Sequence, residues 1–343
     1  VAMADAGLRV VDVRVPSRPL LADEVDLPGW TASVSAVPEA GTPRGWILAS
    51  AREAGLYAFR AEAPPLPSAT PGPSATPYRT PVPTPLPTRS ARPTATAVPR
   101  PIYLPAAHSS GGDKPAGLPA RVVARMPAAA LGNGDLLDVA VAGDRAWVAV
   151  GMANEGAVIA VDLTGMAPRE TGRAALPGWP FGLARSGERL HAALWDRGIH
   201  VLDVSTAVPR AAETIVPPLW PLRLAASGDR VVAAGAAPED PARHRLAVVG
   251  SSAPPVAGAF GRLAVDGAGD RAYVADPTYG LRAYAIDAAG GLAAAGGLAL
   301  AGAVDVARAE TTPEERIAVA FRGDGLRAGG LAIVDAASAP RRV

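Results

Sequence analysis

The sequence predicts an all-β fold assembled from short, repeated strands. Glycine and proline are both abundant, with 37 and 36 among 343 residues, whereas aromatic residues make up only 5%. Frequent Gly and Pro interrupt helices and favour turns, so the plentiful apolar residues are expected in short strands. Two short phrases also recur along the chain, and neither has the periodicity of an amphipathic helix.

The first recurring phrase is a glycine followed by four mostly apolar residues and an aspartate. Its clearest copy is Gly-Ile-His-Val-Leu-Asp, and exact or looser copies occur at 7–12, 157–162, 198–203, 280–287 and 330–335. Each copy has the length and composition of one strand. The closing aspartates are Asp12, Asp162, Asp203, Asp287 and Asp335. We expect their carboxylates to accept backbone N–H bonds from the following turns, which is a structural role rather than a catalytic one.

The second phrase is a glycine, an acidic residue and an arginine, followed by an apolar strand. It starts at Gly143, Gly187, Gly228 and Gly269, with a degenerate copy at 314, so copies lie about 41 to 45 residues apart. This spacing is the period of a four-stranded propeller blade. The glycine supplies the positive φ of a hairpin turn, and the phrase is not a phosphate-binding loop.

One repeat can be divided completely into four expected strands, at 181–185, 189–195, 199–204 and 211–216. Such a sheet cannot bury both of its faces alone. Sheets stacked radially around an axis bury these faces against one another and leave only short edges. The sequence therefore predicts a β-propeller.

Strands are also expected in the N-terminal part, at 8–13, 20–25, 31–37, 45–49 and 55–59. Composition then changes abruptly, because residues 63–118 are dominated by Pro, Thr, Ser and Ala. This segment is predicted to be a disordered linker or insertion that favours extended polyproline II. We divide the chain into 1–62 (a partial first blade and most of a second), 63–118 (the linker) and 119–343 (about five repeats).

Two arrangements of these repeats are open, and we favour the first. In a single ring of about seven blades, residues 56–59 form the third strand of a blade and 120–126 its fourth, after the linker. Closing such a long loop costs only a few kcal/mol. In the rival arrangement, two propellers flank the linker, the second with five or more blades, and 121–126 closes its last blade. No start methionine or signal peptide is visible, so we expect a fragment of a longer protein.

The phrases at 198–203 and 330–335 resemble the core of the LVIVD repeat, which is found in bacterial secreted and cell-surface β-propellers. The preceding strand, as in Ala-Tyr-Val-Ala at 272–275, and the proline after the aspartate, as in Pro209, also fit. Residues 246–250 depart from the pattern because the aspartate is missing, and Asp287 lacks the following proline. The resemblance implies a fold and a location outside the cell, but no shared reaction.

Several classes of function lack support in the sequence. The formal net charge is +1 and there is no cysteine, so neither nucleic acid binding nor thiolate chemistry is indicated. The most apolar window, 290–304, falls short of the about 20 residues that span a bilayer. The histidines, which are His108, His191, His200 and His244, lack metal-ligand spacing. His191 and His200 could meet across a hairpin but would need further ligands. We expect no metal, no cofactor and no catalytic residue.

The tryptophans that lead into blades are the best candidates for a binding site. Trp30, Trp179 and Trp220 precede innermost strands, so they are expected in loops that rim the central channel. There they could stack on a sugar or peptide, or else wedge between blades. On the same face, turns between second and third strands offer Asn154, Glu155, Asp196, Arg197, Asp276 and Tyr279. This mixed set suits binding better than acid–base catalysis.

The function that we favour is a non-catalytic, monomeric binding or scaffolding module outside the cell or on its surface. Its partner is an unidentified protein or glycan. The alternatives are a lactonase-like or glycan-active hydrolase that uses the channel mouth, and a purely structural surface repeat.

Overall fold

The structure is a computed structural model, and it describes residues 8–12, 20–28, 30–38, 44–62, 121–165, 167–258, 261–300, 302–309, 316–321, 330–335 and 341–342. In these ranges the regular elements are β-strands and three short 3-10 helices. The predicted all-β class is confirmed. The predicted linker at 63–118 and His108 lie outside the described residues.

The strands form one two-stranded and six four-stranded antiparallel sheets in the described ranges. The first sheet contains β1 (Leu8–Asp12) and β2 (Leu20–Val25). The second contains β3 (Ser33–Pro38), β4 (Arg44–Ala51), β5 (Gly55–Glu62) and β6 (Arg121–Met126). The third contains β7 (Asp135–Ala142), β8 (Arg145–Met152), β9 (Glu155–Asp162) and β10 (Arg169–Leu176).

The remaining four sheets follow the same order of strands. The fourth has β11 (Gly182–Ser186), β12 (Arg189–Ala193), β13 (Ile199–Asp203) and β14 (Arg210–Ile215). The fifth has β15 (Trp220–Ser227), β16 (Arg230–Ala237), β17 (Asp240–Val248) and β18 (Val256–Ala257). The sixth has β19 (Leu263–Val265), β20 (Arg271–Asp276), β21 (Gly280–Ile286) and β22 (Leu292–Leu298). The last has β23 (Ala303–Ala309), β24 (Arg316–Phe321), β25 (Gly330–Asp335) and β26 (Arg341–Arg342).

The second sheet is built from both sides of the Pro-rich segment. β6 pairs antiparallel with β5, so that Tyr57 lies opposite Arg125 and Leu56 opposite Met126. The Arg125 guanidinium also donates to the carbonyl oxygen of Ala54, with Nη2 at 2.8 Å. The strand predicted over 120–126 therefore completes the same blade as 55–59, which is the pairing that the single-ring arrangement requires.

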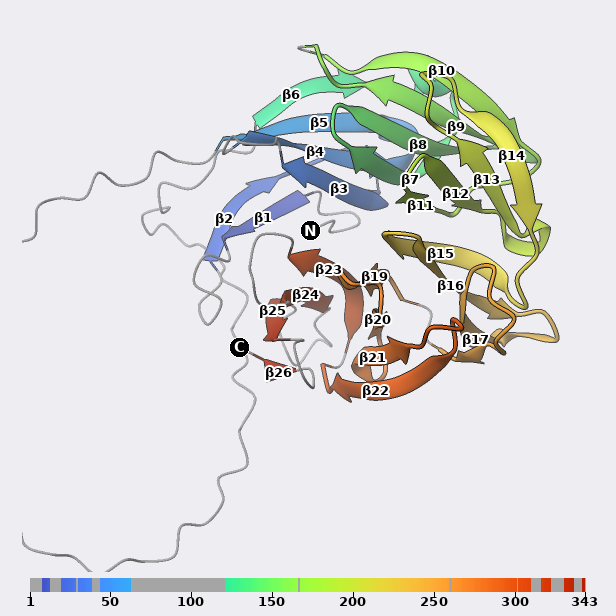
Figure 1. Ribbon diagram of the computed structural model, residues 1–343. Coiled ribbons are helices and arrows are strands. Elements are labelled where there is room, and N and C mark those ends of the chain that lie inside the picture. The colour runs from blue at the N-terminus through green and yellow to red at the C-terminus, as the bar shows by residue number, and fades with distance from the viewer. Residues whose placement is uncertain are drawn as a thin grey trace, which may run out of the picture.

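The sheets are arranged around a common centre, with their first strands innermost (Figure 1). Successive inner strands contact one another from β3 through β7, β11, β15 and β19 to β23. Apolar clusters lie between neighbouring sheets rather than inside one sheet. One joins Leu48 and Leu56 to Val148 and Ile159, and another surrounds the buried Trp147. This radial packing buries both faces of each blade.

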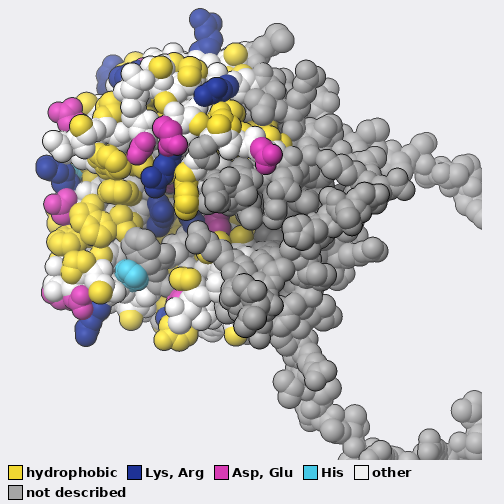
Figure 2. Space-filling view, turned by 180° about the vertical axis from the view of Figure 1, so that it is seen from behind, with side chains coloured by type: hydrophobic (Ala, Val, Ile, Leu, Met, Phe, Trp, Pro, Cys, Tyr) yellow, Lys and Arg dark blue, Asp and Glu magenta, His cyan; other side chains and the backbone are white. Residues whose placement is uncertain are grey.

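The outermost strands differ from the inner ones in burial. Five of the six residues of β14 are exposed, whereas seven of the eight residues of β16 are buried. The face shown in Figure 2 carries hydrophobic, basic and acidic side chains interspersed with one another. Among the described residues, no helix has the length and apolar character needed to span a membrane.

The repeated turns have the predicted chemistry where they are described. The glycines that open the second phrase all have positive φ, between 54° and 75°. Asp203 Oδ1 accepts the Ser205 N–H at 2.9 Å, and Asp162 Oδ1 accepts the Thr164 N–H at 2.9 Å. Hydrogen bonds from these threonine and serine groups lower the pKa of both carboxyls. The predicted role as turn caps is confirmed for these aspartates and for Asp287. The side chains of Asp12 and Asp335 lie outside the described part.

Two local predictions are wrong. The second strand of the repeat ends at Ala193, because residues 195–197 turn into a 3-10 helix, η3 (Trp195–Arg197), with Trp195 at φ 53°. The possible contact between His191 and His200 is also excluded. His200 pairs with Ala192 and His191 with Val201, so the two imidazoles point to opposite faces of the sheet.

Candidate functional site

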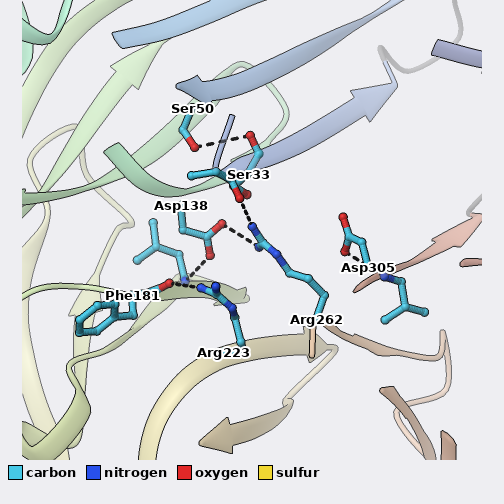
Figure 3. A network of polar contacts seen from close by, with 10 residues as sticks. Ser33, Ser50, Asp138, Phe181, Arg223, Arg262 and Asp305 are labelled. Atoms are coloured by element: carbon cyan, nitrogen blue, oxygen red, sulfur yellow. Dashed lines mark hydrogen bonds and ion pairs between the residues drawn. The ribbon is translucent and has the colours of Figure 1, made fainter. Parts of the chain in front are cut away.

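A ring of residues from equivalent positions of six sheets lies around the central axis. Each member lies among the first four residues of its innermost strand or immediately before that strand. The members of this axial ring are Ser33, Asp138, Gly182, Arg223, Arg262 and Asp305. Asp138, Arg223 and Asp305 each follow a break in strand register. A bulge re-aims a side chain, and here the residue after each bulge faces the axis (Figure 3).

Asp138 and Arg262 form a largely buried ion pair in the axial ring. Arg262 Nη1 lies 3.2 Å from Asp138 Oδ1, and the two side chains are only 22% and 7% exposed. Asp138 Oδ2 accepts the Leu183 N–H at 2.8 Å, and Arg262 Nη2 donates to the carbonyl oxygen of Ala32. One guanidinium thus connects the sixth sheet to the second and third.

The electrostatics of the two axial arginines differ. Burial lowers the pKa of Arg262, but the carboxylates of Asp138 and Asp305 more than offset it, so its pKa is raised. Burial, followed by repulsion from Arg262, lowers the pKa of Arg223 to about 10. Arg223 Nη1 donates to the carbonyl oxygen of Phe181 at 2.7 Å (Figure 3). Both arginines remain cations at neutral pH.

A pocket of about 480 Å³ opens beside Arg223, between the fourth and fifth sheets. We call it the aromatic pocket. Its lining is formed by Gly178, Trp179, Phe181, Leu194, Trp195, Asp196, Arg197, Leu222 and Arg223. Trp220 flanks it, because its ring centroid lies 5.4 Å from that of Trp195. The aromatic rings form a continuous row. The ring centroid of Phe181 lies 6.1 Å from that of Trp179 and 6.5 Å from that of Trp195.

The tryptophan that leads into each of these two blades rests on the preceding blade. Trp179 Nε1 donates to the carbonyl oxygen of Ala153 at 3.0 Å, and its ring lies directly on Gly151. Trp220 packs on Trp195, which occupies the position in its turn that Ala153 has in the previous one. Both rings are half-buried. They therefore combine the two roles considered from the sequence, since they wedge between blades and still present surface to solvent.

The aromatic pocket brings together four of the predicted site residues and leaves three elsewhere. Trp179, Asp196 and Arg197 line it, and Trp220 flanks it. Trp30 is 45% exposed, and the guanidinium carbon of Arg52 lies 5.9 Å from its ring centroid. Trp30 thus forms a separate feature on the second sheet. The predicted turn residues Asn154 and Glu155 are exposed and do not line the pocket.

Asp276 and Tyr279 belong to a different turn, between β20 and β21. The carboxylate of Asp276 is buried and fully used, because it accepts the N–H groups of Thr278 and Tyr279 and lies 2.9 Å from Arg282 Nε. Tyr279 is 64% exposed, with the Arg282 guanidinium carbon 4.2 Å from its ring centroid. Asp276 therefore shapes the turn that presents Tyr279.

Sequence reasoning missed the residues that complete the pocket and the axial ring. Trp195 was assigned to a strand, although it adjoins Asp196. Arg223 follows Trp220 by the same interval that separates Gly182 from Trp179 and Ser33 from Trp30. Aligning the three tryptophan phrases would have identified this position. No group of three or more metal-ligating side chains is present in the described ranges.

Comparison with a family model places the LVIVD repeat at residues 1–26, a range that contains β1 and β2. This match includes the phrase at 7–12 and agrees with the seven consecutive sheets. The chain is a repeat β-propeller protein. A search of curated proteins gives no match.

Solved propellers of similar shape cover nearly the whole chain. A putative 6-phosphogluconolactonase from Bacteroides uniformis ATCC 8492 is 11% identical, with a TM-score of 0.55 over 98% of this chain and 95% of its own. A functionally unknown protein from Desulfotomaculum acetoxidans DSM 771 is 10% identical, with a TM-score of 0.57 over 95% and 88%. A chain of the mitotic checkpoint complex is 12% identical, with a TM-score of 0.50 over 94% and 88%. At these identities the likeness concerns the fold alone.

Proposed function

We propose that this propeller is a non-catalytic binding module and that its ligand sits in the aromatic pocket. The observation that carries the proposal is the row of Trp179, Phe181 and Trp195 beside exposed Asp196 and Arg197. Ligand sites in proteins are concave and mostly apolar, with a few polar groups that fix orientation. Half-buried tryptophan faces suit the apolar C–H face of a sugar ring.

The same geometry favours a glycan over a peptide. One common mode of peptide binding adds a strand to an exposed sheet edge, whereas this pocket is walled by side chains of turns and innermost strand ends. The paired chemistry of Asp196 and Arg197 offers an acceptor and a donor for sugar hydroxyls. The partner that we propose is therefore a carbohydrate.

The proposed place of action is outside the cell or on its surface. The Pro/Thr/Ser-rich composition of 63–118 resembles that of extracellular spacers. Protease treatment of intact cells that produce the native protein tests it. Surface display predicts loss of the protein under conditions that spare an intracellular marker.

A hydrolase is the alternative, and the likeness to the putative 6-phosphogluconolactonase is what brings it forward. The described axial carboxylates offer limited support. Both oxygens of Asp138 are bound, by Arg262 and by the Leu183 N–H, and Asp305 Oδ1 accepts the Val306 N–H. A general base needs a free lone pair near its substrate.

Glycan binding is tested by screening the protein against neutral and acidic oligosaccharides and against peptides. The wild type and Trp195→Ala are compared, with Val216→Ala, a change at an 82% exposed residue outside the pocket, as the control. Removing a stacked aromatic ring should weaken glycan binding at least tenfold, because stacking contributes binding free energy beyond that of the apolar area the ring buries. Binding that Trp195→Ala leaves unchanged, or sugar turnover without stable binding, would contradict the proposal.

A further inference from the structure

Arg223 connects the aromatic pocket to the axial ring. Among the described residues, its guanidinium makes one hydrogen bond, from Nη1 to the Phe181 carbonyl oxygen, and a guanidinium has further N–H donors in a planar fork. Asp138, the carboxylate whose charge acts most strongly on Arg223, is engaged by Arg262. In the described part of the chain, no carboxylate lies within ion-pair distance of Arg223.

A half-buried cation in this setting favours an anionic ligand. Water is partly excluded around Arg223, and a neighbouring cation adds to the cost of its charge, which is why its pKa falls to about 10. An incoming carboxylate supplies both a counter-charge and acceptors for the free donors. Such charge-assisted bonds are shorter and stronger than neutral ones.

The rest of the pocket limits what else the ligand must contain. Arg197 is a second cation at the exposed rim, with Asp196 beside it as a hydroxyl acceptor. The tryptophan faces require a flat apolar surface next to the anionic group. A volume of about 480 Å³ accommodates one or two sugar rings. A simple inorganic anion would leave the aromatic walls unused.

We propose that the aromatic pocket binds an acidic oligosaccharide through the carboxylate of a hexuronate residue, with Arg223 as the group that receives it. Trp179 and Trp195 cover the sugar ring, and Arg197 faces the neighbouring unit. This inference rests on the proposed glycan-binding function and adds the chemical class of the ligand.

The test compares three hexuronate tetramers (galacturonate, glucuronate and mannuronate) with their methyl esters by calorimetry on the whole protein. Esterification removes the negative charge and keeps the ring. We expect the wild type to bind at least one acid at least tenfold more tightly than its ester. Because the interaction is ionic, affinity for the acid should fall with added NaCl while affinity for the ester stays constant. This salt comparison needs no variant.

Variants assign the preference to one residue. Arg223→Gln should reduce the acid-to-ester ratio to near one while ester binding persists, and Arg223→Lys should retain part of the ratio. Arg189→Gln, a change in an exposed pair with Glu213 at 2.6 Å, is the matched control and should leave the ratio unchanged. Thermal unfolding of each variant reports whether it is folded.

Three results would overturn the inference. Equal affinity of the wild type for acid and ester, with Trp195→Ala still abolishing both, would leave the glycan-binding proposal standing and remove the carboxylate. An acid preference that survives in folded Arg223→Gln would place the carboxylate elsewhere. Tighter binding of glucose 6-phosphate than of every hexuronate would assign the pocket to phosphate. Failure to bind any sugar would contradict both proposals together.

Discussion

The guanidinium of Arg262 meets the carboxylate of Asp138 at 3.2 Å, although 124 residues and two complete sheets separate them in the chain. The same guanidinium reaches the carbonyl of Ala32, 230 residues away. Neighbouring blades of a propeller hold one another by apolar packing. This contact instead runs between blades that are not neighbours, so it fixes the width of the ring directly.

Removing this contact should destabilise the whole ring. Breaking a buried ion pair by removing one partner costs about 3–5 kcal/mol, and about 2–3 kcal/mol is expected for Arg262→Gln because the Arg262 side chain is 22% exposed. Urea unfolding measures the change. Arg243→Gln, whose side chain is 77% exposed in its pair with Asp240, should cost below about 0.5 kcal/mol.

A double-mutant cycle with Asp138→Asn separates the pair from its surroundings. If the losses of unfolding free energy in the two single variants add up to the loss in the double variant, Arg262 and Asp138 act independently. Their contact would then contribute no coupling energy.

Gly182 should not tolerate a methyl group. An added Cβ would lie 2.7 Å from the carbonyl oxygen of Leu222 on the next blade, and overpacking of this kind costs about 1–3 kcal/mol. Gly165→Ala is a matched change, because its Cβ would find only ordinary contacts at 3.7 Å. Thermal unfolding of both variants should show a lower midpoint for Gly182→Ala alone. Equal midpoints would mean that the blades can separate without cost.

His191 should make stability fall as pH drops below about 6.5. Burial is the main cause that lowers the pKa of this imidazole from 6.5, and its Nδ1 has no hydrogen-bond partner in the described structure. Since the folded pKa lies below the unfolded one, protonation favours unfolding. The contribution of His191 is complete above about pH 6.5 and is lost as pH falls. His191→Gln should unfold with a shallower pH dependence over this range, measured with urea, and an unchanged dependence would refute the assignment.

Limited proteolysis should cut within 63–118, because this Pro- and Thr-rich composition lacks the apolar residues of a core. The two products should stay together on a sizing column, since β5 and β6 form one sheet. Products that elute separately would instead favour two propellers. Mass spectrometry of the co-eluting products locates the cut.

The repeat phrases predicted the strands well because their signals are local. A glycine with positive φ and an aspartate that caps its own turn, such as Asp203, act within a few residues. The regular spacing between copies of these phrases then predicted the blades. The polar contacts between blades could not be read in the same way, because they join distant positions. Arg145 donates to Thr206 and Arg230 to Asp287 in the next blade, and neither partner is implied by the phrase itself.

The candidate site was predicted only in part for the same reason. Exposed aromatic and charged residues in repeated turns identified Trp179, Asp196 and Arg197. The axial residues fall at strand positions where apolar side chains alternate, and a register shift after Leu136 or Pro221 decides which side chain faces the axis. Bulges have no reliable signature in a single sequence. Arg223 and Arg262 consequently looked like ordinary strand residues.

The pairing of β5 with β6 has a consequence for synthesis of the protein. A ribosome completes β3, β4 and β5 before it reaches residue 63, but the outermost strand of that blade begins at Arg121. The nascent blade therefore waits with its outer edge unpaired while the entire intervening segment is translated, several seconds at about 5–20 residues per second. An open edge is the part of a sheet that recruits other chains. The yield of folded protein should therefore depend on early protection of this edge. A chaperone could cover it, or slow translation initiation could keep neighbouring nascent chains apart.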